Sequence, residues 1–326
     1  MTTKEILDVF PRLRALVVGD ICLDRWCTYD PALADISRET GIPRVAVVST
    51  EVTPGGGGTV ANNLAALGAG RVAVLGVVGR DGFGHELEGA LAARGISSEL
   101  LAPADVPTFT YTKLINRRTG EEDLARVDFV NAAPMPEDTE RELVSRLERV
   151  APGYDVILIA DQAETSRGGV VTAAVRDALA RLASSHPGTV FWADSRLRAD
   201  LFRRVIVKGN RAEMEAASTR AIGRVDYAEL RKFLEAPFLA ITAGGEGAMV
   251  AGEGGTVWSR SRNIAKPVDI CGAGDSFSAG AALALKATGD PMAAASFGNL
   301  AASITIMKKG TGTASPSEVL ERVPEP

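Results

Sequence analysis

The sequence predicts an α/β protein with a mostly parallel central sheet. Short apolar runs rich in β-branched residues alternate with longer stretches of helical periodicity, the order of parallel strands joined by crossover helices. Each apolar run stops at a polar or small residue, as where residues 14–18 are followed by Gly19-Asp20. Ligands of open parallel sheets bind at these carboxyl ends. The acids and glycines that follow the strands are therefore the first indication of function.

The individual elements follow this order along the chain. Buried strands are expected at residues 14–18, 72–78, 155–160, 189–193, 205–207 and 238–242. Helices are expected at residues 57–68, 84–94, 138–150, 168–184, 226–235, 274–287 and 291–307. The tail at residues 324–326 is expected to fray.

Two regions interrupt the alternation of strands and helices. Residues 45–52 alternate in part after Pro43, and residues 108–116 and 124–129 alternate around a turn at 118–121. We expect a few antiparallel strands outside the main sheet, which would form a small β lid over the strand ends from about residues 36–53 and 107–130. An edge hairpin without a role is the alternative.

Composition and charge exclude several classes of protein. The chain has 326 residues with 36 Lys plus Arg against 41 Asp plus Glu, and its net charge of −5 argues against nucleic-acid binding. Neither His85 nor His186 accompanies a Gly-x-Ser-x-Gly turn, which argues against a Ser-His-Asp hydrolase. Cys22, Cys27 and Cys271 form no Cys-x-x-Cys pair. Without a secretory leader or an apolar run of the ~20 residues that span a membrane, a cytoplasmic protein with no membrane partner is expected.

The most specific motif is Asp-Ile-Cys-Gly-Ala-Gly-Asp-Ser-Phe at residues 269–277, which precedes an Ala/Leu-rich helix. Small residues before a helix leave backbone N–H groups free at its positive end, which favours an anion. Asp275 follows this glycine-rich turn directly, where a negative charge would not by itself favour a phosphate. Its position is explained if it takes a proton from a hydroxyl that attacks the phosphate. Capping of the helix by Asp275 is the alternative.

A second motif, at residues 54–68, places four glycines before another helix. These glycines permit close backbone approach to a polar ligand. The motif is not a Walker A loop, because no Gly-Lys-Ser or Gly-Lys-Thr follows, and no Gly-x-Gly-x-x-Gly dinucleotide motif follows the first strand. A flexible turn into the helix is the alternative.

In order and separation, these two motifs resemble the two signature regions of the PfkB/ribokinase family of carbohydrate kinases. The resemblance covers nearly the whole chain, and further matches lie at Gly19-Asp20 with Asp24, at residues 208–213 (Asn-x-x-Glu), at 241–248, at Asn299, at 309–311 and at 315–316. It implies a ribokinase-like three-layer fold with a small β lid, formed as a single kinase domain over residues 1–326. It also implies ATP-dependent phosphoryl transfer to a sugar or sugar phosphate. A nicotinamide dehydrogenase on a similar parallel sheet is the alternative, and the missing dinucleotide motif after the first strand argues against it.

The resemblance implies a role for each matching position. Asp275 would be the base, and the N–H groups of Gly272, Ala273 and Gly274 would stabilise charge on the transferring phosphate. The sugar would be bound by Asp20, Asp24, Gly55, Gly56, Thr59, Asn63, Lys113, Arg126 and Asp161. ATP would be bound by Asn210, Glu213, Thr242, Gly244, Gly247 and Asn299.

Two metal ions are also implied by the family. Asn210 and Glu213 would hold the water shell of Mg²⁺, which keeps several waters when it binds protein. A monovalent cation, K⁺, would lie by Asp269, Gly310 and Ser315. Closure of the lid would exclude water, which otherwise competes as acceptor.

Within the family, three stretches resemble the D-glycero-β-D-manno-heptose 7-phosphate kinases: residues 18–26, residues 36–45, and residues 112–114 with 126–129. We therefore expect a heptose 7-phosphate 1-kinase, and we expect it to lack the nucleotidyltransferase domain that some of these kinases carry. Lys113, Arg117 and Arg126 are candidates to bind the sugar phosphate, with exposed lid charges as the alternative. A kinase for another sugar and a catalytically silent sugar-phosphate-binding relative remain open. A homodimer through the lid is expected.

Three departures from the pattern lie at the sugar end of the expected site. Thr59 stands where the family usually has Asn. Residues 161–165 read Asp-Gln-Ala-Glu-Thr where the heptose kinases usually have Asp-Tyr-x-Lys-Gly, and residues 194–196 read Asp-Ser-Arg where they often have Asp-Pro-Lys. In addition, Cys271 replaces a more usual Thr, either as a small buried residue or as a reactive thiol.

Overall fold

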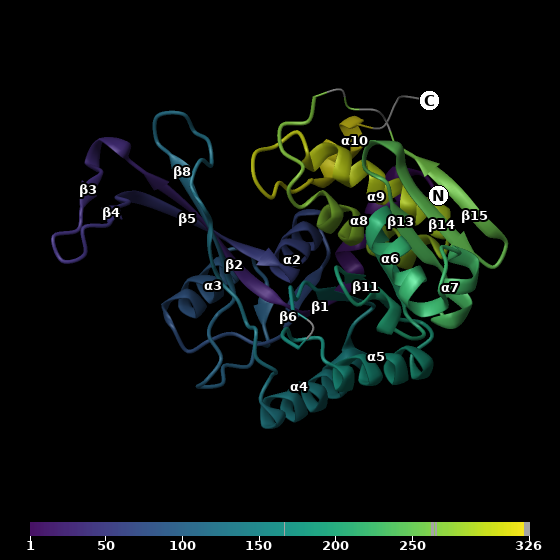
Figure 1. Cartoon of the computed structure of the whole chain (residues 1–326). Coiled ribbons are helices and arrows are strands. Elements are labelled where there is room, and N and C mark those ends of the chain that lie inside the picture. Colours follow the sequence, from purple (N-terminus) through teal and green to yellow (C-terminus); the bar gives the residue numbers. More distant parts are fainter. Residues whose placement is uncertain (166, 262–263, 265, 323–326) are drawn as a thin grey trace.

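A nine-stranded sheet forms the centre of the molecule (Figure 1). The structure is a computed structural model that describes residues 1–165, 167–261, 264 and 266–322. The strand order is β15-β14-β13-β12-β11-β10-β1-β6-β7, in which the pairs β13–β14 and β14–β15 are antiparallel and the other pairs are parallel. The bounds are β1 (Arg14–Gly19), β6 (Arg71–Leu75), β7 (Ser97–Ser98), β10 (Val156–Asp161), β11 (Val190–Ser195), β12 (Ile206–Asn210), β13 (Leu239–Thr242), β14 (Gly247–Gly252) and β15 (Gly255–Arg260).

Helices cover both faces of this sheet and give three layers. The principal helices are α2 (Gly57–Ala66), α3 (Gly82–Ala92), α4 (Glu137–Val150), α5 (Ala173–Ser185), α6 (Arg211–Ile222), α7 (Tyr227–Phe233), α8 (Ala273–Thr288) and α9 (Pro291–Thr305). Strand β1 alternates between two hydrophobic cores, with Val17 packed among residues of α2, α8 and α9, and Val18 among residues of α4 to α7. This alternation is typical of a parallel sheet buried on both sides.

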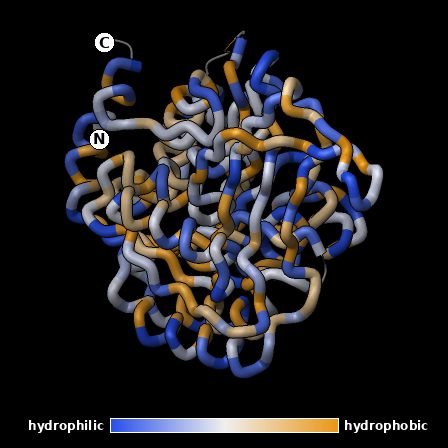
Figure 2. Tube along the Cα trace, turned by 90° about the vertical axis from the view of Figure 1, so that its left-hand side faces the viewer, coloured by the Kyte–Doolittle hydropathy of each residue, from blue (hydrophilic) through white to orange (hydrophobic). Residues whose placement is uncertain are grey.

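The surface helices are amphipathic, with apolar side chains toward the sheet and charged side chains toward the solvent. Figure 2 shows hydrophilic and hydrophobic residues alternating along the helix at the lower edge of the molecule. Helix α4 buries Leu143 and Leu147 there and directs its charged residues outward. None of the helices in the described ranges has the length and apolar character that crossing a lipid bilayer requires.

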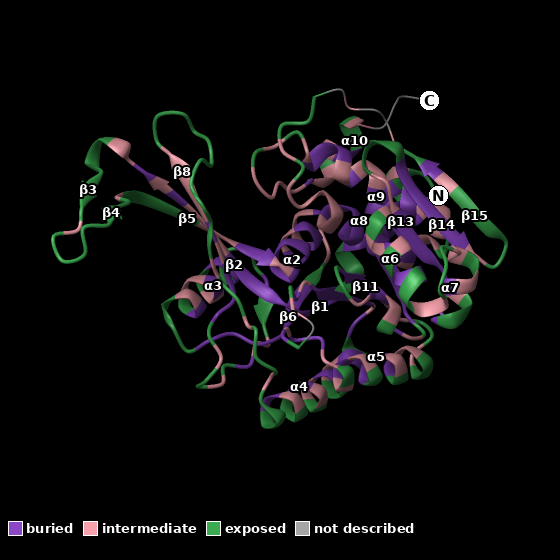
Figure 3. Ribbon diagram, viewed as in Figure 1, coloured by how far each residue is buried: buried purple, intermediate pink, exposed green. Residues whose placement is uncertain are grey.

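The predicted lid is present as a separate four-stranded sheet in the order β5-β2-β8-β9. Its strands are β2 (Ile21–Tyr29), β5 (Val47–Gly56), β8 (Thr110–Asn116) and β9 (Val127–Phe129), and a small hairpin of β3 (Asp35–Ile36) and β4 (Pro43–Arg44) extends it. Figure 3 shows that the far end of the lid is largely exposed, whereas the end next to the main sheet is buried.

The lid differs from the prediction in one respect. Its central strand, β2, was not predicted, and β2 pairs in parallel with β8, so the sheet is not wholly antiparallel. Gly19 makes β2 possible because it turns the chain out of the main sheet at φ 136°. A Cβ atom at Gly19 would lie 2.1 Å from the carbonyl oxygen of Ala160.

Other predicted elements agree within a few residues, with four kinds of difference. The strand expected at 72–78 ends at Leu75, after which Val77 forms only an isolated bridge with Leu101. The helix expected at 168–184 begins at Ala173, where Thr172 caps it. Helix α6 and the hairpin of β14 and β15 were not predicted. Nor were the short terminal helices α1 (Thr3–Leu7) and α10 (Pro316–Arg322). The expectation for residues 324–326 lies outside the described residues, and the single domain over 1–326 stays a prediction.

Candidate active site

Two cavities meet at the beginning of helix α8. The larger, about 600 Å³, lies at the ends of strands β11 to β13 and against α8 and α9. The smaller, about 210 Å³, lies between the lid and the main sheet. Gln162, Arg196, Gly272 and Asp275 line both cavities. Asp275 therefore stands where a ligand in one cavity meets a ligand in the other.

The backbone before α8 explains the small residues of the first motif. Gly272 adopts a left-handed conformation at φ 77°, and a Cβ at Gly274 would lie 2.9 Å from the Nζ of Lys208. Gly272, with no side-chain hydrogen bond, is the N-cap, so Asp275 does not cap the helix. Of the three N–H groups expected to bind phosphate, that of Ala273 already donates to the carbonyl of Ile270 at 3.2 Å.

The carboxyl group of Asp275 is half-buried where the two cavities meet. Burial, and then the negative charge of Asp194, raise its pKa to about 7, while the positive charge of Lys208 opposes the shift. A carboxyl with a pKa near neutrality can both take and release a proton at physiological pH. This geometry and pKa suit a general base.

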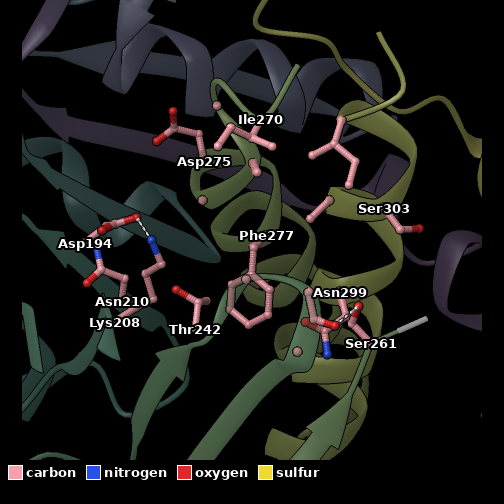
Figure 4. A pocket seen from close by; sticks show the side chains of 18 of the residues that line it. Asp194, Lys208, Asn210, Thr242, Ser261, Ile270, Asp275, Phe277, Asn299 and Ser303 are labelled. Carbon is pink, nitrogen blue, oxygen red and sulfur yellow. Dashed lines mark hydrogen bonds and ion pairs between the residues drawn. The ribbon is translucent and has the colours of Figure 1, made fainter. Parts of the chain in front are cut away.

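A buried ion pair lies beside Asp275. The Nζ of Lys208 donates to Oδ2 of Asp194 at 2.8 Å, as Figure 4 shows, and the hydroxyl of Ser278 donates to the same oxygen at 3.0 Å. Burial lowers the pKa of Lys208, but Asp194 outweighs this effect and the net pKa is raised, so the lysine stays charged. Sequence reasoning did not single out this pair. Its signal was available, because both residues stand at the ends of adjacent parallel strands and pair in register.

The residues expected to bind ATP all line the larger cavity: Asn210, Glu213, Thr242, Gly244, Gly247 and Asn299. Figure 4 shows Asn210, Thr242 and Asn299 around one space. Asn210 and Glu213 also form a reciprocal cap at the start of α6, with N–H to side-chain distances of 3.0 and 2.7 Å. Among the residues that the structure describes, no group of three or more His, Cys, Asp or Glu could hold a metal ion by itself.

The residues expected to bind the sugar divide into two groups. Asp24, Gly56, Thr59, Lys113 and Arg126 line the smaller cavity. Burial raises the pKa of Asp24 to about 6. The Nζ of Lys113 lies 4.3 Å from the centre of the Trp26 ring. Gly55 contributes by its lack of a side chain, because a Cβ there would lie 2.3 Å from a carboxylate oxygen of Asp24.

The second group lies behind the cavity instead of lining it. The carboxylate of Asp20 accepts hydrogen bonds from the N–H groups of Gln162 at 2.8 Å and Val170 at 2.7 Å. Asp161 binds the Ser195 hydroxyl at 2.6 Å and the Arg198 guanidinium. The amide of Asn63 donates to the carbonyl of Thr59 at 3.0 Å. Asp20 and Asp161 therefore hold the chain that follows β10 and β11, whereas the contact of Asn63 lies within helix α2.

The cations proposed for a sugar phosphate also separate. Arg126 forms an ion pair with Asp128 within the lid. Arg117 pairs with Asp30 at 2.9 Å, and its side chain is 63% exposed, away from the cavity lining. Lys113 and Arg126 are therefore the two that face the smaller cavity.

The remaining predicted positions lie near the start of α8. Asp269 accepts the N–H groups of Cys271 at 2.9 Å and Gly310 at 3.1 Å. Ser315 is engaged elsewhere, with its hydroxyl donating to Glu318 at the start of α10. Cys271 lines the smaller cavity, and burial raises the pKa of its thiol, which favours an inert side chain.

Comparison with known proteins identifies relatives of this chain. The family model described as pfkB family carbohydrate kinase matches residues 15–318. The bifunctional protein HldE of Pelobacter propionicus is 31% identical over 342 residues, which cover 99% of this chain and 66% of that protein. The HldE of Chromohalobacter salexigens is 32% identical over 319 residues, covering 96% of this chain and 64% of that protein. This chain thus spans just under two thirds of the length of these relatives.

Solved structures show the same fold. Ribokinase from Thermotoga maritima superposes with a TM-score of 0.69 at 20% identity, covering 95% of this chain and 99% of that one. Phosphofructokinase-2 from Escherichia coli in complex with potassium gives a TM-score of 0.71 at 20% identity, covering 95% and 97%. The expected ribokinase-like fold is confirmed. This chain belongs to the pfkB family and is an ATP-dependent carbohydrate kinase.

Proposed function

We propose that this kinase transfers the γ-phosphoryl group of ATP to the C1 hydroxyl of a sugar that already carries a phosphate, best matched by heptose 7-phosphate. The observation that carries this proposal is Asp275 at the junction of the two cavities. ATP would occupy the larger cavity and the sugar the smaller. The similarity to HldE proteins and the cations Lys113 and Arg126 support the sugar phosphate.

In the proposed reaction, the carboxylate of Asp275 takes the proton of the sugar hydroxyl. The hydroxyl oxygen then forms a bond to the γ-phosphorus, and the bond from that phosphorus to the oxygen of the leaving ADP breaks. The N–H groups of Gly272 and Gly274, with that of Ala273 once it leaves Ile270, would stabilise the negative charge that develops on the phosphoryl oxygens. The positive charge of Lys208 lies close to the same place.

Asn210 and Glu213 fit a water-mediated Mg²⁺ site, because both line the larger cavity and Mg²⁺ keeps most of its waters. Bound Mg²⁺ neutralises charge on the ATP phosphates. A K⁺ ion is proposed beside Asp269 and Gly310, whose contact holds the loop next to Gly272.

A kinase for a different sugar is the second candidate. The hydroxyl of Thr59 donates to the carbonyl of Pro54 at 3.2 Å, and Glu164 adds a negative charge to the smaller cavity. Coupled ADP release with ATP, Mg²⁺ and K⁺ should separate the candidates across a panel of sugars and sugar phosphates. Turnover of one phosphorylated sugar would support the proposal. Turnover of unphosphorylated sugars alone, or of none, would contradict it.

Removing the charge of Lys113 is expected to weaken binding of a sugar phosphate specifically. A Lys113→Met variant should raise KM for the phosphorylated sugar by about tenfold, the scale of one charge-assisted hydrogen bond, and change KM for the unphosphorylated analogue much less. The control is Arg117→Met, because Arg117 lies outside the cavity lining and pairs with Asp30. Equal effects of Lys113→Met on both substrates would place the phosphate elsewhere.

We also propose that the lid forms a homodimer contact. Ile36 and Ile42 near the end of the lid are 61% and 63% exposed, and Val47 is 46% exposed. Large apolar side chains as exposed as these are candidates for an interaction site. An Ile36→Lys/Ile42→Lys variant is expected to sediment as a monomer where the natural chain sediments as a dimer. Monomeric behaviour of the natural chain would refute this proposal.

A further inference from the structure

Glu164 joins the lid to the main body of the protein. One of its carboxylate oxygens, Oε1, accepts a hydrogen bond from the hydroxyl of Tyr111 at 3.0 Å and another from the guanidinium of Arg196 at 3.1 Å. Tyr111 belongs to lid strand β8, whereas Glu164 and Arg196 follow strands β10 and β11 of the main sheet. A single carboxylate oxygen therefore connects the two sheets.

Both partners of Glu164 lie in the candidate active site. Tyr111 lines the smaller cavity, and burial raises the pKa of its hydroxyl, so it remains a hydrogen-bond donor. Arg196 lines both cavities at the junction where Asp275 stands. One side chain, Glu164, thus contacts both the lid and this guanidinium.

The loop that carries Glu164 is held from behind. Asp20 accepts the N–H groups of Gln162 and Val170 on either side of it. The guanidinium of Arg198 binds both Asp161 and, at 3.2 Å, the carbonyl of Gly168. These contacts tie residues 162, 168 and 170, on either side of Glu164, to the main sheet. Asp20 and Asp161 therefore act as structural supports of this loop, since neither lines the larger or the smaller cavity at Asp275.

We propose that Glu164 is a positioning residue that latches the lid to the junction and orients Arg196 toward the transferring phosphoryl group. This proposal rests on phosphoryl transfer at Asp275. With the latch formed, the lid excludes water from the γ-phosphate and Arg196 is held in reach of it. Without the latch, the lid opens more often and water competes with the sugar.

Hydrogen exchange of the ligand-free protein tests the latch without any substrate. In Glu164→Met and in Tyr111→Phe, the amides of residues 110–113 should exchange about three- to tenfold faster, the range of one partly exposed ion pair or hydrogen bond. The control is Tyr29→Phe, which removes a tyrosine hydrogen bond of 2.6 Å to Asp123 at the outer part of the lid. It should leave residues 110–113 unchanged. Unchanged exchange in both latch variants would overturn the proposal.

Kinetics test the coupling to catalysis. Each latch variant should lower kcat about three- to tenfold. Each should also raise the fraction of ADP that is released by hydrolysis of ATP, without transfer of the phosphoryl group to the sugar. Tyr29→Phe should do neither. The double variant Glu164→Met/Tyr111→Phe should be no worse than the Glu164 single variant, because removal of the Glu164 carboxylate already breaks its contact with Tyr111. Fully additive effects, or an unchanged fraction of wasted ATP, would overturn the latch. Faster exchange with no sugar accepted from the panel would support the latch and contradict the proposed substrate.

Discussion

Replacing Asp275 with asparagine is expected to lower kcat by about 10²- to 10⁴-fold while ATP and the sugar still bind. Asparagine keeps the size of the side chain but cannot take the proton of the attacking hydroxyl. The N–H groups at the start of α8 and the charge of Lys208 remain in place. Turnover is measured by ADP release, and binding by calorimetry with each ligand. Near-normal turnover of the purified variant would refute the assigned base.

The pH dependence gives a second measure of the same group. The kcat/KM of the natural chain is expected to rise with pH through about 7, because the base must be ionised and burial raises the pKa of Asp275 to about 7. The Asp275→Asn variant should lack this rise in its residual activity. A rise centred near pH 4 in the natural chain would contradict a buried base.

Stability separates a lost base from a misfolded protein. The pKa of Asp275 in the folded state lies above its ordinary value of 3.8, so its contribution to stability is present at low pH and is lost as pH rises toward about 7. At pH 8 the folded natural chain carries a negative charge on the desolvated carboxylate of Asp275, whereas the Asp275→Asn variant has no charge there. The variant is therefore expected to have a higher Tm than the natural chain at pH 8, although it is nearly inactive. If the Tm of the variant at pH 8 were lower than that of the natural chain, the loss of activity would be explained by a damaged fold and not by loss of the base.

The parts of the fold predicted correctly are those with strong local signals. The central strands read as continuous apolar runs because both of their faces are buried. Helix α6 has no comparable signal, since its buried face, formed by Met214, Ala217 and Ser218, carries one large apolar side chain alone. Strand β2 was missed because Asp20 interrupts the apolar run only one residue before it, and only the conformation of Gly19 shows that the chain turns there.

The candidate site shows the same division between local and long-range information. Residues 272–275 were predicted because a glycine-rich turn and its helix are adjacent in sequence. The placement of Asp20 could not be predicted, because its partners Gln162 and Val170 are 142 and 150 residues away. A carboxylate after a strand looks the same in sequence whether it faces a ligand or a loop. Only the tertiary contacts distinguish these two uses.

Removing Asp194 is expected to produce the largest loss of stability. Asp194→Ala leaves the ammonium of Lys208 buried, with its side chain 6% exposed, and without the carboxylate that it now contacts at 2.8 Å. Breaking a buried pair by removing one partner costs about 3–5 kcal/mol, because the remaining charge is neither hydrated nor paired. Urea denaturation measures this loss. The control Glu148→Ala breaks the ion pair of Glu148 with Arg181, in which the side chains are 46% and 61% exposed, respectively. This change should cost about 0–1 kcal/mol.

A double variant and the pH profile distinguish the buried charge from simple loss of packing. Asp194→Ala/Lys208→Met removes both charges, so it should recover part of the lost stability, whereas a packing defect would deepen. The negative charge of Asp194 raises the pKa of Asp275, and the positive charge of Lys208 lowers it. Asp194→Ala should therefore lower this pKa and move the acid limb of kcat/KM to lower pH. A double variant less stable than the single one, with an unmoved acid limb, would mean that the pair does not act through its charge. The recovery and the shift together would assign this ion pair, which the sequence analysis did not identify as a pair, to the control of the catalytic proton.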